Sequence, residues 1–266
     1  MTKGAVALCL LLLAGLRPAL ATDLIYASIG TGTYGGGYYT TARALCARIN
    51  AAERGRMRCA PEATAGSIYN LRALEAGEID LAIAQSDWSF NALNGYSVFD
   101  GEGMTGAFRG VGALYVEAVT ILAAQDSGIT RAMDLVGRRI DIGHPASGRR
   151  ATVQVALDAL ALDTDAFAEI AEFSDDAAIE ALCTGGIDAT ILTLGHPSAL
   201  VRQAVEGCGA RLVPLAGPAI ESLIDRAPYY VLTDVPAGTY EGQDEPVATF
   251  GVRAFLLART SLDNAV

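Results

Sequence analysis

The glycine-rich segment at residues 30–37 limits most strongly what this chain can fold into. It follows residues 24–29, which are short, apolar and rich in strand-forming side chains. From residue 39 to residue 50, apolar side chains recur at the three- and four-residue spacing of a helix. The pattern therefore predicts a strand, a loop and a helix, with the loop holding Gly30, Gly32, Gly35, Gly36 and Gly37.

A loop of this kind leaves backbone N–H groups free at the start of a helix, where the helix dipole also favours an anion. Glycine lets a ligand approach the main chain closely. We therefore expect Gly30, Thr31 and Gly32 to contact a phosphate or carboxylate group, and Tyr38, rather than Tyr39, to present its hydroxyl there. A dinucleotide fingerprint (Gly-x-Gly-x-x-Gly) and a tight turn without a ligand are the two alternatives.

Residues 1–21 have the features of a signal peptide, which are a positive Lys3, an apolar run over residues 5–13 and a small-residue cleavage site ending at Ala21. The apolar run is too short to span a bilayer comfortably. No later segment approaches 18 uninterrupted apolar residues. We expect cleavage after Ala21 and an exported, soluble mature protein.

The charge of the mature chain argues against polyanionic partners. The signal peptide contains Lys3 and Arg17, so 17 basic residues, none of them lysine, remain against 30 acidic ones. This net charge of −13 disfavours binding to nucleic acid or to anionic membranes. It does not exclude a small anion held by local donors.

Four cysteines remain after the signal peptide, and an even number in an exported chain predicts two disulfides. Three pairings are possible. We expect Cys46–Cys59 and Cys183–Cys208, because each pair lies within one predicted structural unit. A zinc site is the alternative, although the chain has no C-x-x-C pair and only two histidines, His144 and His196.

Two further candidate contacts follow in the first unit. Residues 64–67 open the next predicted helix, so Thr64, Gly66 and Ser67 offer a second helix N-terminus, with Ser67 as its cap. Gln85 ends an otherwise apolar strand over residues 79–85, and the carboxyl end of such a strand is a favourable place for a ligand contact.

A second unit repeats this layout. Residues 178–191 mirror residues 71–83, since both are predicted to form a helix, a glycine, an Ile-Asp pair and a buried strand. Ser147 and Gly148 open a helix after a strand at residues 139–143, and Arg150 is placed to pair with a carboxylate. Two matching α/β units predict two lobes that share a ligand cleft.

The remaining segments complete the predicted architecture. Two separate strands are expected at residues 110–116 and 118–124, with Glu117 serving a structural role near the hinge between the lobes. Lobe 1 is expected at residues 22–116, lobe 2 at 117–214, and a return to lobe 1 at 215–266. A helix is expected to begin at Thr260.

Four segments resemble the TAXI family, the solute-binding subunits of tripartite ATP-independent periplasmic (TRAP) transporters. They are Ile29–Tyr39, Thr64–Leu71 with Ala82–Asp87, Asp134–Ile140 with Ser147-Gly148, and Val235–Tyr240. The resemblance implies a two-lobed type II periplasmic-binding fold that closes on an organic acid or acidic amino acid and delivers it to TRAP membrane subunits.

The sequence departs from the TAXI pattern at two places. The family commonly has Ser-Gly-Thr-Arg where this chain has Ser147-Gly148-Arg149-Arg150, and its members continue some tens of residues beyond the position of Val266, which implies a shortened first lobe here. We expect a monomeric periplasmic binding protein with no cofactor and no enzymatic activity. The alternatives are a ligand sensor on the same fold, and an exported hydrolase using Ser147 or Ser198 with His144 or His196.

Overall fold

The computed structural model describes residues 24–145 and 147–262. The predicted signal peptide lies outside these residues. So does most of the helix expected from Thr260, of which only a turn up to Leu262 is described. Among the described residues, no helix has the length and hydropathy needed to cross a bilayer.

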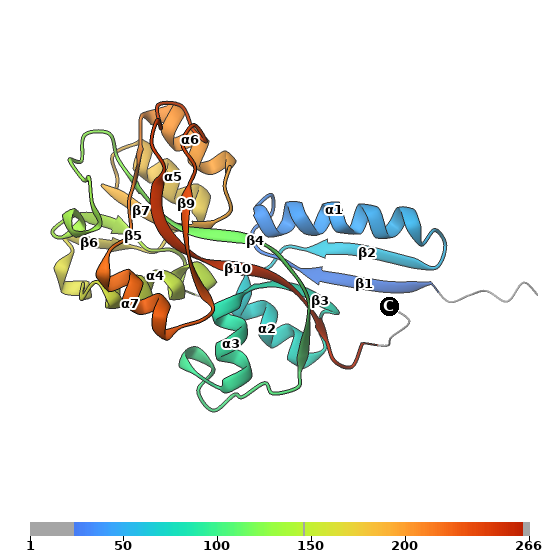
Figure 1. Ribbon diagram of the computed structural model, residues 1–266. Helices are drawn as coiled ribbons and strands as arrows, with labels where there is room; N and C mark the ends of the chain where they lie inside the picture. The colour runs from blue at the N-terminus through green and yellow to red at the C-terminus, as the bar shows by residue number, and fades with distance from the viewer. Residues whose placement is uncertain (1–23, 146, 263–266) are drawn as a thin grey trace, which may run out of the picture.

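The first half of the molecule is built from three parallel strands and three helices (Figure 1). The glycine segment opens a helix as expected, and α2 ends at Gly77, which adopts the left-handed conformation (φ 73°) that a helix C-cap favours. The elements are β1 (Ile25–Gly30), α1 (Gly37–Ala52), β2 (Met57–Glu62), α2 (Ser67–Ala76), β3 (Leu81–Gln85), α3 (Ser86–Asn94) and the 3-10 turn η1 (Ser97–Phe99).

The second half has a similar layered construction. Strands β5, β6 and β7 are parallel to one another, and β8 and β9 are added on the long strands described below. The elements are η2 (Ala132–Leu135), β5 (Arg139–Asp141), α4 (Gly148–Ala159), η3 (Thr164–Ala166), β6 (Glu169–Ala171), α5 (Asp175–Cys183), β7 (Ala189–Leu194), α6 (Ala199–Cys208), β8 (Arg211–Val213), α7 (Pro218–Arg226) and β9 (Tyr230–Val235).

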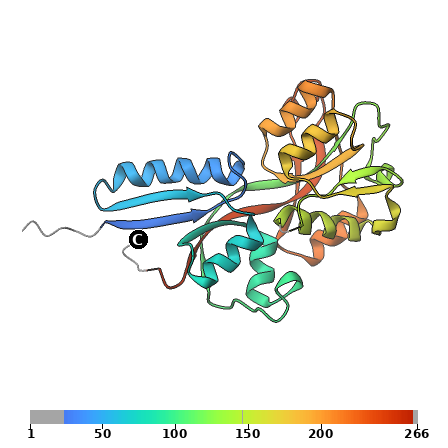
Figure 2. The ribbon, with the colours of Figure 1, turned by 180° about the vertical axis from the view of Figure 1, so that it is seen from behind.

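Two long antiparallel strands, β4 (Phe108–Ala123) and β10 (Val247–Arg259), connect the halves (Figures 1 and 2). The first part of β4 pairs with the last part of β10 in the first half, while their other ends pair with β7, β8 and β9 in the second half. The sheet is therefore continuous through the molecule, in the order β2-β1-β3-β10-β4-β7-β5-β6.

The expectation of two separate strands around Glu117 is wrong. Residues 108–123 form one strand, because the ladder with β10 continues through Glu117, which pairs with Val252 and is only 6% exposed. The charged residue interrupts the apolar pattern of the sequence without interrupting the hydrogen bonds of the strand.

The repeated Ile-Asp pair has the same structural role in both halves. The Asp80 carboxylate accepts a hydrogen bond from the Ser28 amide of the neighbouring strand β1, at 2.9 Å, and pairs with Arg259 at 2.8 Å. The Asp188 carboxylate accepts one from the Arg139 amide of β5, also at 2.9 Å, and pairs with the Arg139 side chain at 2.7 Å. Each aspartate thus ties its strand to the adjacent parallel strand.

Helices cover both faces of the sheet in each half. In the first half, α1 packs on one face over Ile29 and Ile83, while α2 and α3 bury Leu71 and Trp88 on the other. In the second half, one apolar cluster joins α4 and α7, and a second joins α5 and α6. These layers hold the loops between strands and helices at the boundary of the two halves.

The chain stays with the second half beyond residue 215, where its return to the first half was expected. Leu215, Ile220 and Phe250 lie in the same apolar cluster as Ile140 of the second half. The chain re-enters the first half only within β10, whose residues Ala254–Ala258 pair with β3.

Both expected disulfides are formed. Cys46 is joined to Cys59, with their Cα atoms 4.9 Å apart, and Cys183 is joined to Cys208, with their Cα atoms 5.3 Å apart. The first bridge ties α1 to β2 in the first half, and the second ties α5 to α6 in the second half. With all four of these cysteines paired, none of them is a thiolate ligand for zinc.

Candidate functional site

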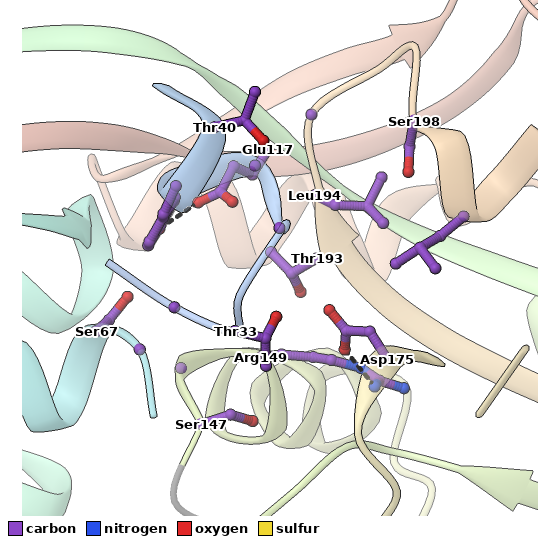
Figure 3. A pocket seen from close by; sticks show the side chains of 18 of the residues that line it. Thr33, Thr40, Ser67, Glu117, Ser147, Arg149, Asp175, Thr193, Leu194 and Ser198 are labelled. Carbon is purple, nitrogen blue, oxygen red and sulfur yellow. Dashed lines mark hydrogen bonds and ion pairs between the residues drawn. The ribbon is translucent and has the colours of Figure 1, made fainter. Parts of the chain in front are cut away.

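A cavity of about 690 Å³ lies between the two halves of the molecule (Figure 3). The first half contributes the glycine segment and the starts of α1 and α2, and the second half contributes the starts of α4, α5 and α6. Glu117 of β4 also lines it. A ligand in this space would contact both halves at once.

Six helices begin at this cavity. The residue that caps the N-terminus of each of α1 to α6 is part of its lining, and these caps are Gly36, Gly66, Gln85, Ser147, Ser174 and Ser198. The first N–H groups of a helix have no partner within the helix, and the helix dipole is positive at this end. The backbone therefore makes the cavity favourable for an anion without any charged side chain.

Seven of the residues expected at the site line the cavity. They come from the loops of both halves and are Gly32, Tyr38, Gly66, Ser67, Gln85, Ser147 and Gly148. Ser147 caps α4 by accepting a hydrogen bond from the Arg150 amide at 3.1 Å. Ser67 is instead the first residue of α2, after Gly66 at the cap. Its hydroxyl accepts a hydrogen bond from the backbone N–H of Gln85 at 3.1 Å.

Gly30, Thr31 and Thr64 are not among the residues that line the cavity. The Thr31 hydroxyl donates to the Glu62 carbonyl at 2.6 Å, and the Thr64 hydroxyl lies 2.9 Å from the Thr31 carbonyl. A β-carbon at residue 30 would lie only 2.5 Å from the side chain of Ile79, so packing behind the loop explains the glycine there. These three residues support the glycine loop from behind.

The arginine at the cavity is Arg149 instead of Arg150. The Arg150 side chain turns away from the cavity toward Gln154, at 3.0 Å, and Glu172, at 3.3 Å. Helix geometry decides between the two, because neighbouring residues on a helix point about 100° apart.

Arg149 is buried in a network of the second half, with 7% of its surface exposed. Its guanidinium pairs with Asp175 at 2.7 Å (Figure 3). It also pairs with Asp141 and donates to the Thr190 hydroxyl at 2.9 Å. Its Nε donates to the Ile191 carbonyl at 2.7 Å. Two carboxylates thus offset the one positive charge, so Arg149 brings no net positive charge to the cavity.

Glu117 lines the cavity, although only a structural role near the hinge was expected for it. Tyr38 Oη donates a hydrogen bond to Glu117 Oε2 at 2.5 Å, from α1 to β4. Burial raises the pKa of Glu117 to about 8, with smaller contributions from the negative charges of Asp87 and Asp175, although the Tyr38 bond acts in the opposite direction. Burial raises the pKa of Tyr38 well above its usual value, and the negative charge of Glu117 and its hydrogen bond to Tyr38 add smaller increases.

Thr193 of β7 also lines the cavity and places a buried hydroxyl there. Its Oγ1 is buried and has no hydrogen-bond partner among the described residues. Buried polar atoms are nearly always hydrogen bonded, so an orphan at a cavity calls for a partner supplied from the cavity itself.

The wall at Pro197 and Ser198 is held by a neutral histidine. His196 is hydrogen bonded through Nδ1 to Tyr240 Oη at 2.6 Å and through Nε2 to Thr120 Oγ1 at 2.8 Å. Burial lowers the pKa of His196 to about 4. Because both ring nitrogens are engaged, His196 has no nitrogen left to activate Ser198, as the hydrolase alternative requires.

Comparison with known proteins agrees with this architecture. The sequence pattern of the NMT1-like family matches residues 29–266. The fold is similar to that of the periplasmic aliphatic sulphonate binding protein SsuA from Escherichia coli (17% identity, TM-score 0.53) and of the alkanesulfonate-binding protein SsuA from Xanthomonas axonopodis pv. citri bound to MOPS (20%, 0.52). Each comparison covers 88% of this chain and 65% of the other, so the chain spans about two thirds of their length.

A third similar structure is PhnD1 from Prochlorococcus marinus (MIT 9301) in complex with methylphosphonate, with 12% identity and a TM-score of 0.53. This comparison covers 90% of this chain and 78% of PhnD1. The expected fold class is confirmed, since the neighbours share the mixed α/β, two-lobed architecture of periplasmic binding proteins.

Proposed function

Because this chain belongs to the NMT1-like family and has the fold of two-lobed periplasmic binding proteins, we propose that it is a periplasmic solute-binding protein for a small anion. The observation that carries the proposal is the convergence of six helix N-termini on one cavity between the halves. The solute enters between the halves, and closure surrounds it with donors from both.

The donors in this proposal are mainly backbone N–H groups and hydroxyls. Arg149 is already paired with two acids, and the chain has no lysine after its third residue. Backbone donors suit a small acid, since a carboxylate, sulfonate or phosphonate offers several oxygens to several helix N-termini. The sulfonate- and phosphonate-binding neighbours support this ligand class, and we place an organic carboxylate first in it.

We further propose delivery to the membrane subunits of a TAXI-type TRAP transporter. The four TAXI-like segments of the sequence support this assignment, and three of the segments contribute cavity residues, among them Gly32, Ser67 and Ser147. A ligand sensor on the same fold is the alternative. A neighbouring gene for TRAP membrane subunits would favour transport, whereas one for a receptor kinase would favour sensing.

The first test is a thermal-shift screen of the oxidised protein, unfolded and refolded to remove bound solute. The panel holds carboxylates, sulfonates, phosphonates, sugars and nucleotides. A ligand at one hundred times its dissociation constant stabilises the protein by about 2.7 kcal/mol, which shifts the melting temperature measurably. We expect a response from acids, followed by saturable binding in isothermal titration. Silence from every acid contradicts the proposal.

A charge placed at a helix N-terminus locates the site. Ser174→Asp keeps a good capping residue on α5 but adds a negative charge to the cavity lining. We expect affinity for the acid to fall about tenfold or more, because like charges a few ångström apart repel by about 2–4 kcal/mol at an effective dielectric constant near 20. The control is Ser222→Asp on α7, which is exposed and outside the cavity. Equal affinity in the two variants would contradict the assignment of the site.

A further inference from the structure

Glu117 is a buried acidic side chain with few hydrogen-bond partners, an environment that suits a cationic ligand. It is 6% exposed, it lies on β4 where the halves meet, and it lines the cavity (Figure 3). Tyr38 Oη bonds to its Oε2, while Oε1 accepts no hydrogen bond from the described part of the chain. A buried carboxylate normally has a cationic partner or several hydrogen-bond donors.

Among the described lining residues, no arginine or lysine is available to supply that cation. Arg149 is the only arginine or lysine among the described lining residues, and it is held by Asp141 and Asp175. The nearby charged groups that act on Glu117 are Asp87 and Asp175, which are both acids. Glu117 therefore lies at a cavity whose described arginine is already paired with two other acids.

Thr193 provides a second acceptor on the same side of the sheet. In the β4–β7 ladder, Val119 is opposite Thr193 and Ala118 is opposite Leu194, so Glu117 and Thr193 are diagonal neighbours on one face. Thr193 is 9% exposed, and its hydroxyl oxygen is buried and has no hydrogen-bond partner among the described residues. An ammonium group has three donors and can bond to both oxygens.

We propose that Glu117 and Thr193 form a subsite for a protonated amino group, so that the solute carries an ammonium group as well as an acid group. This inference rests on the proposed function, because the helix N-termini hold the acid group of the same solute. The solute class is thereby narrowed to amino carboxylates, amino sulfonates or amino phosphonates. Tyr38 acts as a positioning residue, since it fixes the Glu117 carboxylate through Oε2 and leaves Oε1 for the solute.

Matched pairs of acids with and without an amino group test this directly in isothermal titration. The pairs are L-alanine and propionate, L-glutamate and glutarate, taurine and ethanesulfonate, and 2-aminoethylphosphonate and ethylphosphonate. We expect the amino member of the bound pair to be tighter by about tenfold or more, as for other hydrogen bonds to charged groups. A deaminated acid that binds as tightly as its amino partner overturns the inference and leaves the proposed function standing. Silence from all eight overturns both.

Variants identify the residue responsible. Glu117→Gln keeps an oxygen for the Tyr38 bond and removes the charge, so affinity for the amino acid of the pair should fall toward that of its deaminated partner, whose own affinity should change little. Glu180→Gln, an exposed acid on α5 outside the cavity, is the matched control and should leave both affinities unchanged. If Glu117→Gln fails to fold, Thr193→Val tests the same preference. An unchanged preference in the folded variants contradicts the assignment.

Proton release gives an independent readout. The titratable groups facing Glu117 are Tyr38 and Tyr115, whose pKa values burial raises, together with Asp87 and Asp175. Since burial raises the pKa of Glu117 to about 8, the empty site is largely protonated at pH 7. Binding an ammonium group should ionise it and release close to one proton, measured by titration in buffers of different ionisation enthalpy. Tight binding without proton release indicates a neutral Glu117 donating to an anion, which overturns the inference.

Discussion

At the scale of single residues, Arg149 and Arg150 show how different two adjacent arginines can be. Arg149 satisfies Asp141, Asp175 and the Thr190 hydroxyl inside the second half, whereas Arg150 forms a partly exposed pair with Glu172. Removing one partner of a buried ion pair leaves the other charge uncompensated. The two arginines therefore form a natural comparison of buried and exposed pairs.

We expect Arg149→Ala to lower the free energy of unfolding by about 3–5 kcal/mol, because Asp141 would keep a buried charge without its partner. Arg150→Ala, one residue away on the same helix, should cost at most about 1 kcal/mol, as exposed pairs do. Urea denaturation of both variants measures the difference. Similar losses in the two would contradict the account of the buried network.

Two buried acids predict how stability depends on pH. Burial raises the pKa of Glu117 from 4.5 to about 8 and that of Asp87 from 3.8 to about 7. The unfolded chain therefore loses these protons at a lower pH than the folded protein does, so stability falls as the pH rises from about 4 to about 8. The same test applies to Asp87, because its carboxyl group is also buried.

Denaturation at pH 5 and pH 8 should show ligand-free wild type losing stability, and Glu117→Gln and Asp87→Asn each losing less. The matched control is Glu180→Gln, whose exposed carboxyl group should leave the slope as it is in wild type. A wild-type stability that rises over this interval would show that other groups determine the pH dependence.

Sequence reasoning named seven residues that line the cavity, among them Ser67, Gln85 and Ser147, but missed Glu117, Thr193 and the role of Arg149. The residues it identified follow from local patterns, since a helix start can be recognised from its neighbours in the chain. The missed residues depend on distant partners. Thr193 stands within a continuous apolar strand, and nothing nearby in the sequence shows that its hydroxyl faces a cavity.

At the scale of secondary-structure elements, the close approach of α2 and α4 joins the two halves beside the cavity. A β-carbon at Gly148 would collide with the Gln85 side chain and lie 3.0 Å from the Ser67 hydroxyl. Trp88 Nε1 of α3 also donates to the Gly148 carbonyl at 3.1 Å. A larger first residue on α4 would therefore have to displace the ends of the Gln85 and Ser67 side chains.

Gly148→Ala should destabilise the protein by about 1–3 kcal/mol through overpacking and should weaken solute binding, because the extra methyl group separates the two halves. Gly112→Ala in β4 is the matched control, since a β-carbon there has no neighbour within 4 Å. Thermal unfolding and titration with the acid found in the screen measure both effects. A Gly148→Ala protein with unchanged melting temperature and affinity would contradict the need for this contact.

Most elements could be predicted from local sequence, including α2 with its Gly77 end and the strand that ends at Gln85. The long strands could not. The charge of Glu117 divides the β4 pattern into two apolar runs, and only the pairing with β10 makes them one strand. Likewise, α7 and β9 have no local feature that assigns them to the second half, because their apolar faces fit any sheet of similar shape.

At the scale of the whole molecule, the Ile-Asp repeat correctly indicated two α/β units. It could not indicate how the units are joined, because the joining strands lie outside the repeat. The halves also contact each other through Asp87, whose carboxylate accepts a hydrogen bond from Thr152 of α4 at 2.8 Å. The cavity and this contact both lie at the boundary, so a ligand held in the cavity would act on the relative orientation of the halves.

Binding should therefore make the molecule more compact. We expect the radius of gyration, about 18 Å for a compact chain of this length, to fall by about 0.5–1 Å when the acid found in the screen is added at saturation. Small-angle X-ray scattering measures the change. The Ser174→Asp protein, at a concentration of acid too low to fill its weakened site, should show none. An unchanged radius in saturated wild type would contradict closure.

The two strands that connect the halves make the joint resemble a torsion spring more than a door hinge. In β4 and β10, residues 108–118 pair with residues 251–259, so a rotation of one half against the other is shared among many peptide units and their hydrogen bonds. Each unit then bends by a small angle, and the restoring torque grows steadily with rotation. If the halves rotate when the proposed solute binds, the strands would store elastic energy in one of the two end positions, and the release of that energy would help to set how fast the solute leaves.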